Sequence, residues 1–281
     1  MKKVESIAQL RRICEKEEPF LERPVSFIAV CLTKLFLYTG ISANQVTLLS
    51  IFIGLGAGIF FVYGQNWSML VGSLMWCLHG VLDYSDGQIA RYRCTAGLTG
   101  TYLDKLAHQI VDPYIFITIA FGLYSTFHSA VVFAFGFSAG ISMLLYRLAT
   151  YNTYICIVEE RLHYLEDNTS SVEEPKADTL SPKEITPHGA LASRLPFIYA
   201  LACYMPGYGM IIMLLVATVI DLLTGPWAVG PFTFNSVYIY LCLWGILTLF
   251  PWTAFAWLAV KNRSTERLYA KLFGQPMGQK E

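Results

Sequence analysis

Long apolar stretches, separated by short polar ones, run through most of this 281-residue chain. Six of them approach or exceed the roughly 20 residues that a helix needs to cross a bilayer. They are residues 44–65, 68–92, 97–126, 128–160, 196–223 and 234–261. The pattern predicts an all-α, polytopic membrane protein with six transmembrane helices.

The first forty residues and the one long polar connection differ from these stretches. Residues 23–40 are apolar but contain Arg23 and Lys34, so an amphipathic helix in the membrane plane is favoured over a further span, which stays the alternative. Residues 163–190 are rich in Ser, Pro and acidic residues, and they predict a cytosolic loop. The expected organisation is a juxtamembrane amphipathic segment at 1–40, a six-helix membrane domain at 41–262 and a cytosolic C-terminal tail at 263–281.

Lysine and arginine are distributed unevenly between the connections. With six spans, the connections near 65–68, 126–129 and 223–234 contain neither residue, whereas the two chain ends and the 161–195 connection hold most of them. Positively charged residues collect in cytoplasmic loops of membrane proteins. We therefore expect a multi-pass protein of the inner or plasma membrane with both termini in the cytoplasm.

The composition narrows the classes of function. Charged residues make up 14% of the chain and the mean hydropathy is +0.48, whereas soluble domains carry about 25% charged residues. No basic stretch with interleaved aromatic residues indicates nucleic-acid binding. The seven cysteines lack C-x2-C spacing, so neither a disulfide framework nor a zinc site is indicated. The first 20 residues contain no apolar core of a signal peptide, and no cleavable signal is expected.

One polar stretch, DYSDGQIARYRCTAGLTGTYLDKLAHQIVD, lies within membrane-grade apolar sequence between Asp83 and Asp112. Ionisable groups at membrane depth are costly and by default mark a functional site. At helical spacing, one face of a first helix would hold Asp83, Asp86, Gly87, Ala90 and Arg91, and one stripe of a second helix would hold Gly100, Asp104, His108 and Asp112. Two such helices facing each other would gather carboxylates of the kind that bind divalent cations. The active face would lie at the cytoplasmic ends of these two helices.

The spacing Asp83-x2-Asp86-Gly87-x2-Ala90-Arg91-x8-Gly100-x3-Asp104-x3-His108 resembles the signature of the CDP-alcohol phosphatidyltransferase family, D-x2-D-G-x2-A-R-x8-G-x3-D-x3-D. Seven of the eight defining positions match, and the resemblance covers roughly residues 40–125. The eighth position differs, because the family has a fourth aspartate, its catalytic base and a metal contact, where this chain has His108. This departure concerns the chemistry and leaves the expected fold unchanged.

The resemblance implies an integral-membrane transferase of phospholipid biosynthesis. Such an enzyme moves a phosphatidyl or related phosphoalcohol group from a CDP-linked donor, such as CDP-diacylglycerol, to an acceptor alcohol, and releases CMP. By resemblance, Asp83, Asp86 and Asp104 would bind two Mg²⁺ or Mn²⁺ ions, and His108 would be the catalytic base. The donor would contact Asn44, Thr47, Gly87, Ala90, Arg91 and Gly100. The resemblance leaves room for a homodimer.

Several of these residues have a second interpretation. Asn44 and Thr47 resemble the P-N-x2-T element that precedes the family's first core helix, with Ala43 in place of the proline, but Asn44 could equally cap that helix. His79 could orient Asp83, one turn away, or could simply be a packing residue. Asp112 could replace the missing acid.

The cations around the site are also open to two interpretations. Lys105, Arg147 and Arg194 are candidate anchors for a phosphate on the acceptor. Arg147 could instead mark the cytoplasmic end of its helix. Arg91 suits a diphosphate because its planar guanidinium matches phosphate oxygens. Arg91 could instead extend from the helix end to the membrane surface, but this interpretation suits Arg93 better.

Two other functions stay open at this point. The chain could be a catalytically silent relative that binds CDP-alcohols, and the single feature that favours this function is His108. A transporter could use intramembrane carboxylates, but the D-x2-D-G-x2-A-R spacing has no reason to occur there. The sequence does not identify the donor or the acceptor.

Overall fold

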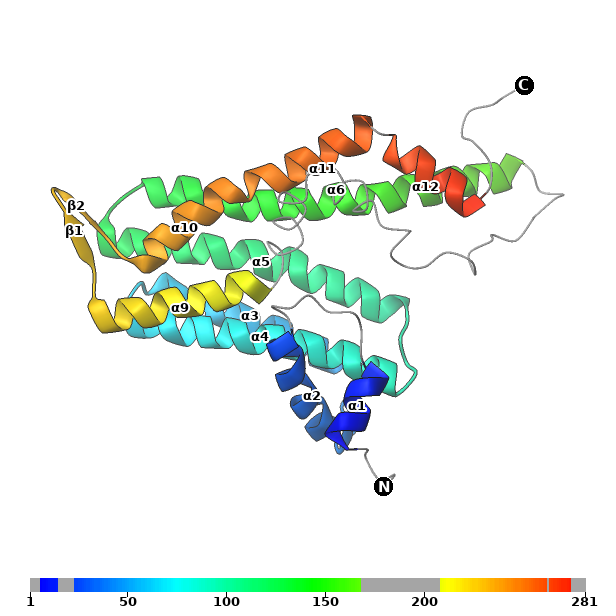
Figure 1. The fold of residues 1–281 in the computed structure, drawn as a ribbon, viewed down its shortest axis with the longest axis horizontal. Coiled ribbons are helices and arrows are strands. Elements are labelled where there is room, and N and C mark those ends of the chain that lie inside the picture. The colour runs from blue at the N-terminus through cyan, green and yellow to red at the C-terminus, as the bar shows by residue number, and fades with distance from the viewer. Residues whose placement is uncertain (1–5, 15–22, 168–207, 262, 274–281) are drawn as a thin grey trace. The chain divides into compact units, whose positions relative to one another are not determined.

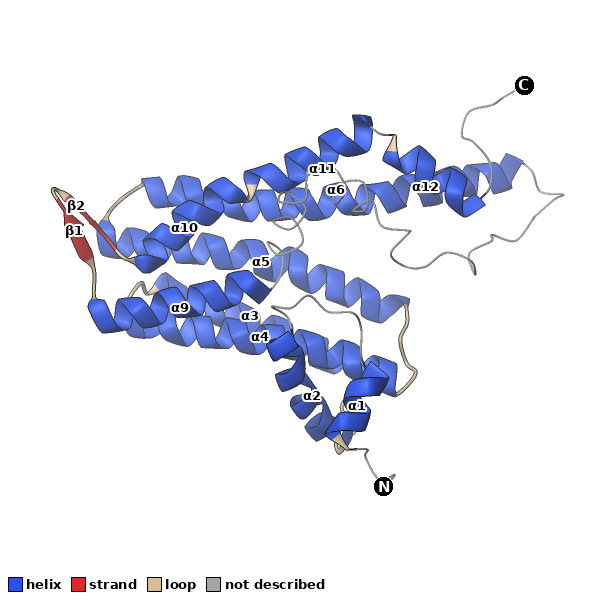
Figure 2. Ribbon diagram, viewed as in Figure 1, coloured by secondary structure: helices blue, strands red, loops and turns tan. Residues whose placement is uncertain are grey.

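A computed structural model describes residues 6–14, 23–167, 208–261 and 263–273. The chain divides into two compact units, the first of residues 1–141 and 204–246, the second of residues 142–203 and 247–281. Almost all regular structure in the described residues is helical (Figures 1 and 2). The all-α class is therefore confirmed.

Four helices form the centre of the first unit. They are α3 (Ala43–Val62), α4 (Asn66–Tyr92), α5 (Leu98–Phe127) and α9 (Tyr208–Thr224). Helix α3 packs against both α4 and α5, and α4 also packs against α9. Aromatic rings join α4 to α5 and α5 to α10 (Ser236–Leu247): Trp76 lies edge-on to Phe116 at 6.2 Å, and Phe116 stacks on Tyr240 at 6.3 Å. The first of these contacts joins α4 to α5.

Local sequence signals explain where α3 begins and how closely it approaches α5. Ser42 is the N-cap of α3 and forms a capping box with Gln45. At the other end, a Cβ atom placed on Gly122 would lie 2.0 Å from the carbonyl oxygen of Phe61. A side chain cannot fit there, so glycine at position 122 permits the close approach of the two helices.

Two short helices, α1 (Ile7–Cys14) and α2 (Arg23–Leu37), lie at the end of the first unit where α4 turns into α5 (Figure 1). Helix α2 packs on α4, and the Thr33 hydroxyl donates a hydrogen bond of 2.8 Å to Gln88 Oε1. Arg93 donates to backbone carbonyls after α2, at Ile41 and, at 3.1 Å, at Thr39. With 15 residues, α2 is about 22 Å long, shorter than the roughly 30 Å of a bilayer's hydrocarbon core. This length supports the in-plane position, which stays a prediction.

A hairpin that the sequence did not predict lies at the opposite end of the first unit (Figure 2). Strands β1 (Trp227–Val229) and β2 (Phe232–Phe234) pair antiparallel, with Ala228 opposite Thr233. Gly225 and Gly230 adopt positive φ angles of 69° and 61° on either side of β1, a conformation that glycine accepts most readily. Hence the 223–234 connection, which the sequence identified only as a short segment without Lys or Arg, contains regular structure.

The second unit includes most of α6 (Val131–Asp167), whose first residues belong to the first unit, together with α11 (Leu249–Lys261) and α12 (Ser264–Phe273). The predicted loop at 163–190 begins too early, because α6 continues to Asp167. The predicted tail at 263–281 contains α12, whose Leu268 and Tyr269 are buried against Ile157 of α6. The remainder of both segments lies outside the described residues.

Within the described ranges, four helices are long and apolar enough to cross a membrane. They are Ala43–Val62, Leu98–Phe127, Val131–Tyr164 and Ser236–Lys261, with shorter apolar helices at Val25–Leu37 and Gly209–Thr224. The last of the four is broken at Thr248 into α10 (Ser236–Leu247) and α11, with Pro251 in the first turn of α11, where proline is tolerated. Helix α4 has the length but carries the motif's charged residues. The chain is thus a polytopic membrane protein, and the number of six spans stays a prediction.

Candidate active site

Three predicted site residues from two helices meet beside α3. His108 Nε2 of α5 lies 3.4 Å from Asp83 Oδ2 of α4 and 3.9 Å from Asp104 Oδ1, one turn earlier on α5. One ligand atom from each of the three residues lies within 4.8 Å of the others. The arrangement has the spacing needed for a shared cation.

Exposure changes steadily along the α5 stripe. The Asp104 side chain is 47% exposed, His108 is 22% exposed, and Asp112 is 8% exposed. A ligand that reaches this site therefore meets Asp104 and Nε2 of His108 before it meets Asp112. The other ring nitrogen, Nδ1, lies 3.5 Å from Asp112 Oδ2 on the buried side.

Asp86 of α4 is more buried than Asp83 and has a hydrogen-bond partner on α3. It is buried, and the hydroxyl of Thr47 donates a hydrogen bond of 2.5 Å to its Oδ2 atom. The resemblance assigned Thr47 to the donor site, whereas the structure places its hydroxyl on a proposed metal ligand. Such a contact fixes the orientation of a carboxylate before any ion binds.

Gly87 and Gly100 lie next to the polar groups expected to bind the donor. A Cβ atom on Gly87 would lie 3.1 Å from Arg91 Nη1, so the guanidinium folds over this glycine. A Cβ atom on Gly100 would lie 3.3 Å from Asn44 Oδ1. Since Ser42 caps α3, the capping interpretation of Asn44 is wrong, and its side chain faces α5 instead.

The cations and Ala90 complete the set of predicted residues. Ala90 is half-buried in the last turns of α4. Arg91 Nε is shielded from solvent and makes no hydrogen bond within the described part of the chain. Lys105 is exposed on α5 next to Asp104, and Arg147 belongs to the second unit. Arg194 lies outside the described residues, so the grouping of the three proposed acceptor anchors stays a prediction.

His79 has a partner that its spacing did not suggest. Its Nδ1 atom lies 2.9 Å from the carbonyl oxygen of Ser50, and its ring stands edge-on to that of His108 with centroids 6.4 Å apart. His79 therefore packs against the imidazole of His108. The one-turn spacing to Asp83 pointed to a different neighbour.

The balance of charge at the site favours a cation. Asp83, Asp104 and Asp112 lie around one imidazole, and Asp86 lies one turn from Asp83 on α4. Carboxylate oxygens are the ligands that Mg²⁺ and Mn²⁺ prefer, and an imidazole nitrogen is better suited to Mn²⁺ than to Mg²⁺. The donor set therefore fits a divalent metal ion.

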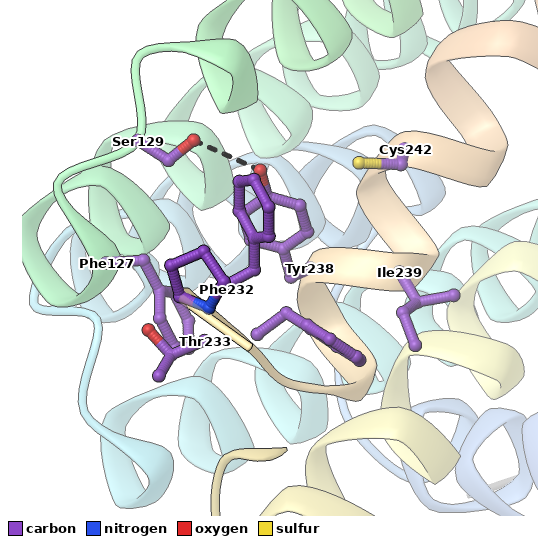
Figure 3. Close-up of a pocket in the computed structure, with 9 residues that line it drawn as sticks. Phe127, Ser129, Phe232, Thr233, Tyr238, Ile239 and Cys242 are labelled. Carbon is purple, nitrogen blue, oxygen red and sulfur yellow. Dashed lines mark hydrogen bonds between the residues drawn. The ribbon is translucent and has the colours of Figure 1, made fainter. Parts of the chain in front are cut away.

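A hollow lies at the other end of α5 (Figure 3). It has a volume of about 530 Å³ and is lined by the hairpin, the end of α5 and the start of α10. Ser129 Oγ and the Tyr238 hydroxyl lie 3.1 Å apart in its wall. Along α5, Phe127 is about 28 Å from His108, so this hollow is separate from the carboxylate site.

Comparison with known proteins gives a family and a fold. The family model for CDP-alcohol phosphatidyltransferase matches residues 40–181. The crystal structure of Mycobacterium tuberculosis phosphatidylinositol phosphate synthase (PgsA1) with CDP-DAG bound is similar, with a TM-score of 0.51 and 12% identity over 83% of this chain and 91% of that one. The same synthase in complex with manganese and citrate aligns with a TM-score of 0.45 and 14% identity, over 82% and 88% of the two chains. No curated protein sequence matches.

Proposed function

Because this chain belongs to the CDP-alcohol phosphatidyltransferase family, we propose that it transfers a phosphoalcohol group from a CDP-linked donor to an acceptor hydroxyl and releases CMP. The observation that carries the proposal is the convergence of Asp83, Asp104 and His108 from two helices that also hold the motif's glycines. CDP-diacylglycerol is the first donor to test, since the mycobacterial synthase of similar fold was solved with CDP-DAG bound.

Asp83, Asp86 and Asp104 are the proposed metal ligands, with Thr47 orienting Asp86. Two Mg²⁺ or Mn²⁺ ions held there would neutralise the donor's diphosphate and stabilise the attacking and leaving oxygens. Asp83 and Asp104 approach from different helices, so each depends on the packing of α3 against both α4 and α5.

The donor's diphosphate is proposed to lie along α4 and the start of α5. Arg91 offers a buried Nε without a hydrogen bond among the described residues, which a phosphate oxygen would satisfy. Gly87, Ala90 and Gly100 have no bulky side chains and so leave space for the diphosphate at this surface. The amide of Asn44 reaches the surface from α3. Lys105, Arg147 and Arg194 stay proposed anchors for the acceptor.

The proposed chemical step is a displacement at the phosphorus that bears the donor's alcohol. The acceptor oxygen forms a new bond to this phosphorus while the bond from phosphorus to the bridging oxygen breaks, and CMP leaves with the electron pair. His108 takes the proton of the acceptor hydroxyl at Nε2, which is the ring nitrogen on the exposed side. We propose that this step takes place at the cytoplasmic face of the membrane, because the distribution of Lys and Arg predicts that both termini lie in the cytoplasm.

The test uses the purified full chain in detergent with CDP-diacylglycerol and Mn²⁺ or Mg²⁺. Each reaction contains one acceptor, either glycerol 3-phosphate, inositol 1-phosphate, serine or a second lipid, and both CMP and the lipid product are measured. We expect CMP and one new phospholipid in equal amounts, loss of both with EDTA, and recovery with added metal. CMP formation that persists in EDTA would contradict the metal assignment.

A catalytically silent relative is the second candidate, and His108 in place of the family's aspartate is the observation that favours it. Such a protein would bind CDP-diacylglycerol without releasing CMP with any acceptor. Binding of radiolabelled donor, measured beside turnover on the same sample, separates the two functions.

A further inference from the structure

The imidazole of His108 lies between two carboxylates of its own helix. Asp104, His108 and Asp112 are spaced at i, i+4 and i+8 of α5, so their side chains form one stripe. Nε2 is 3.9 Å from Asp104 on the exposed side, and Nδ1 is 3.5 Å from Asp112 on the buried side. The two ring nitrogens therefore face different surroundings.

The buried nitrogen needs a partner that the exposed one does not. Nδ1 of His108 is shielded from solvent, and the Asp112 carboxylate beside it is itself buried. A buried N–H group that makes no hydrogen bond is costly, and a carboxylate is a strong acceptor. The 3.5 Å separation is at the outer limit of a hydrogen bond, and a small rotation of the ring would shorten it.

The other ring beside His108 is already held by the backbone. His79 has its Nδ1 atom 2.9 Å from the Ser50 carbonyl oxygen, and a carbonyl can only accept, so Nδ1 of His79 carries a proton. Its edge-on contact with His108 restricts the rotation of the His108 ring. The ring of His108 is thus confined between His79, Asp112 and the acidic pair of Asp83 and Asp104.

We propose that Asp112 is a positioning residue, which accepts a hydrogen bond from the Nδ1–H group of His108 and so holds Nε2 toward Asp83 and Asp104. The inference rests on the proposed function, in which His108 is the base. An aspartate at position 108 would need no such partner, because a carboxylate has no second nitrogen to orient. The positioning role of Asp112 therefore exists only because residue 108 is a histidine.

The first test is a double-mutant cycle on the full chain, with CMP release from CDP-diacylglycerol and the most active acceptor as the readout. With His108 present, we expect Asp112→Ala to lower kcat by roughly 10–100-fold, the usual cost of losing an orienting partner, with KM for the donor nearly unchanged. In the His108→Asp background, the same substitution should change kcat by less than about twofold. An equal loss in both backgrounds would overturn the proposal, because Asp112 would then act on its own or through the fold.

Two further variants keep this cycle interpretable. Asp112→Asn conserves the side-chain volume and should lose less activity than Asp112→Ala, because an amide oxygen still accepts a hydrogen bond from the Nδ1–H group. Asp221→Asn alters a buried carboxylate of the same unit that binds backbone N–H groups of α10, and it should give the same kcat per folded molecule in either background.

The second test needs no turnover, and so it separates this inference from the proposed function. The chain has five histidines, and the ¹⁵N NMR signals of His108 in labelled protein with EDTA are identified by their loss in His108→Asp. We expect the wild-type ring to carry a proton at Nδ1 with the ¹⁵N shift of a hydrogen-bonded N–H group, and this shift to be lost in Asp112→Ala. A wild-type ring protonated at Nε2 alone, or one unchanged by Asp112→Ala, would overturn the proposal whether or not CMP is released.

Samples prepared with Mn²⁺ in place of EDTA test a competing role. His79, His108 and Asp112 also have ligand atoms within 4.8 Å of one another, as a metal ion would require. We expect equal metal content in wild type, Asp112→Ala and His79→Gln. Loss of one equivalent of metal in both variants would show that the three residues hold an ion of their own, and would overturn the positioning role.

Discussion

Two regions of the first unit hold buried aspartates in apolar helices, and their partners differ. Asp221, near the end of α9, is 2% exposed, and its two carboxylate oxygens accept hydrogen bonds from the backbone nitrogens of Ser236 and Val237, at 2.6 and 3.0 Å. Asp83, on α4, instead faces His108 and lies in a group with Asp104. One carboxylate caps a helix, whereas the other is part of a collection of like charges.

This difference shows that an ionisable residue within an apolar segment does not by itself indicate a functional site. The carboxylate of Asp221 stabilises the start of α10, where backbone N–H groups have no partner within the helix. The acids around His108 repel one another and would be stabilised by a cation. Thus the partners of a buried acid distinguish a structural role from a catalytic one.

The largest expected effect follows from removing a proposed metal ligand. Asp83→Ala or Asp104→Ala should lower CMP release by roughly a thousandfold or more, since metal ions contribute several kcal/mol of transition-state stabilisation and each 1.36 kcal/mol is tenfold in rate. Asp86→Ala should behave likewise. CMP release per folded molecule is the measurement, and Asp221→Asn is the matched control.

If Asp221→Asn lost as much turnover as Asp83→Ala while remaining folded, the distinction between the two regions would fail. Undiminished CMP release in Asp83→Ala or Asp104→Ala would instead contradict the metal-ligand assignment.

Removal of the base should have the next largest effect. We expect His108→Ala to lower kcat by roughly 10²–10⁴-fold, the usual cost of losing a general base, while binding of CDP-diacylglycerol persists. His108→Asp should keep measurable turnover with a preference shifted from Mn²⁺ toward Mg²⁺, because oxygen ligands suit Mg²⁺. Normal turnover in His108→Ala together with loss in Asp112→Ala would assign the base to Asp112.

The sequence predicted the fold class and the convergence at Asp83, Asp104 and His108 for one physical reason. Both depend on local periodicity, since hydropathy identifies apolar helices and spacing by three and four places side chains on one helix face. An acidic face on each of the two helices could thus be expected before any tertiary contact was known, whereas the meeting of the two faces was an assumption that the structure confirms.

Contacts between distant parts of the chain could not be predicted in this way. The Thr47 hydroxyl on Asp86 and the Ser50 carbonyl at His79 depend on how α3 packs against α4, which periodicity does not specify. The same holds for α12 on α6 and for the cap that Asp221 gives to α10. The hairpin has strands of three residues, too short for an alternating pattern to be recognised.

A smaller effect, on stability alone, is expected where α3 and α5 approach each other closely. Gly122→Ala would place a Cβ atom 2.0 Å from the Phe61 carbonyl oxygen, and we expect a loss of about 1–3 kcal/mol in the free energy of unfolding. Gly40→Ala is the matched control, because no atom lies within 4 Å of its added Cβ. Thermal unfolding in detergent measures both, and an equal melting temperature for the two variants would contradict the close packing.

The smallest expected effect is at Asp221. In Asp221→Asn the side chain keeps one oxygen acceptor and loses the other, so one of the two backbone N–H groups, of Ser236 or Val237, loses its partner. We expect a cost of about 1 kcal/mol in the free energy of unfolding, the usual net value of one hydrogen bond. Hydrogen exchange of the first amides of α10 should become faster, whereas exchange of the amides within α4 should not change. CMP release per folded molecule should also stay the same. Loss of CMP release without faster exchange in α10 would show that Asp221, like Asp83, takes part in the reaction, and the contrast between the two carboxylates would then have no basis.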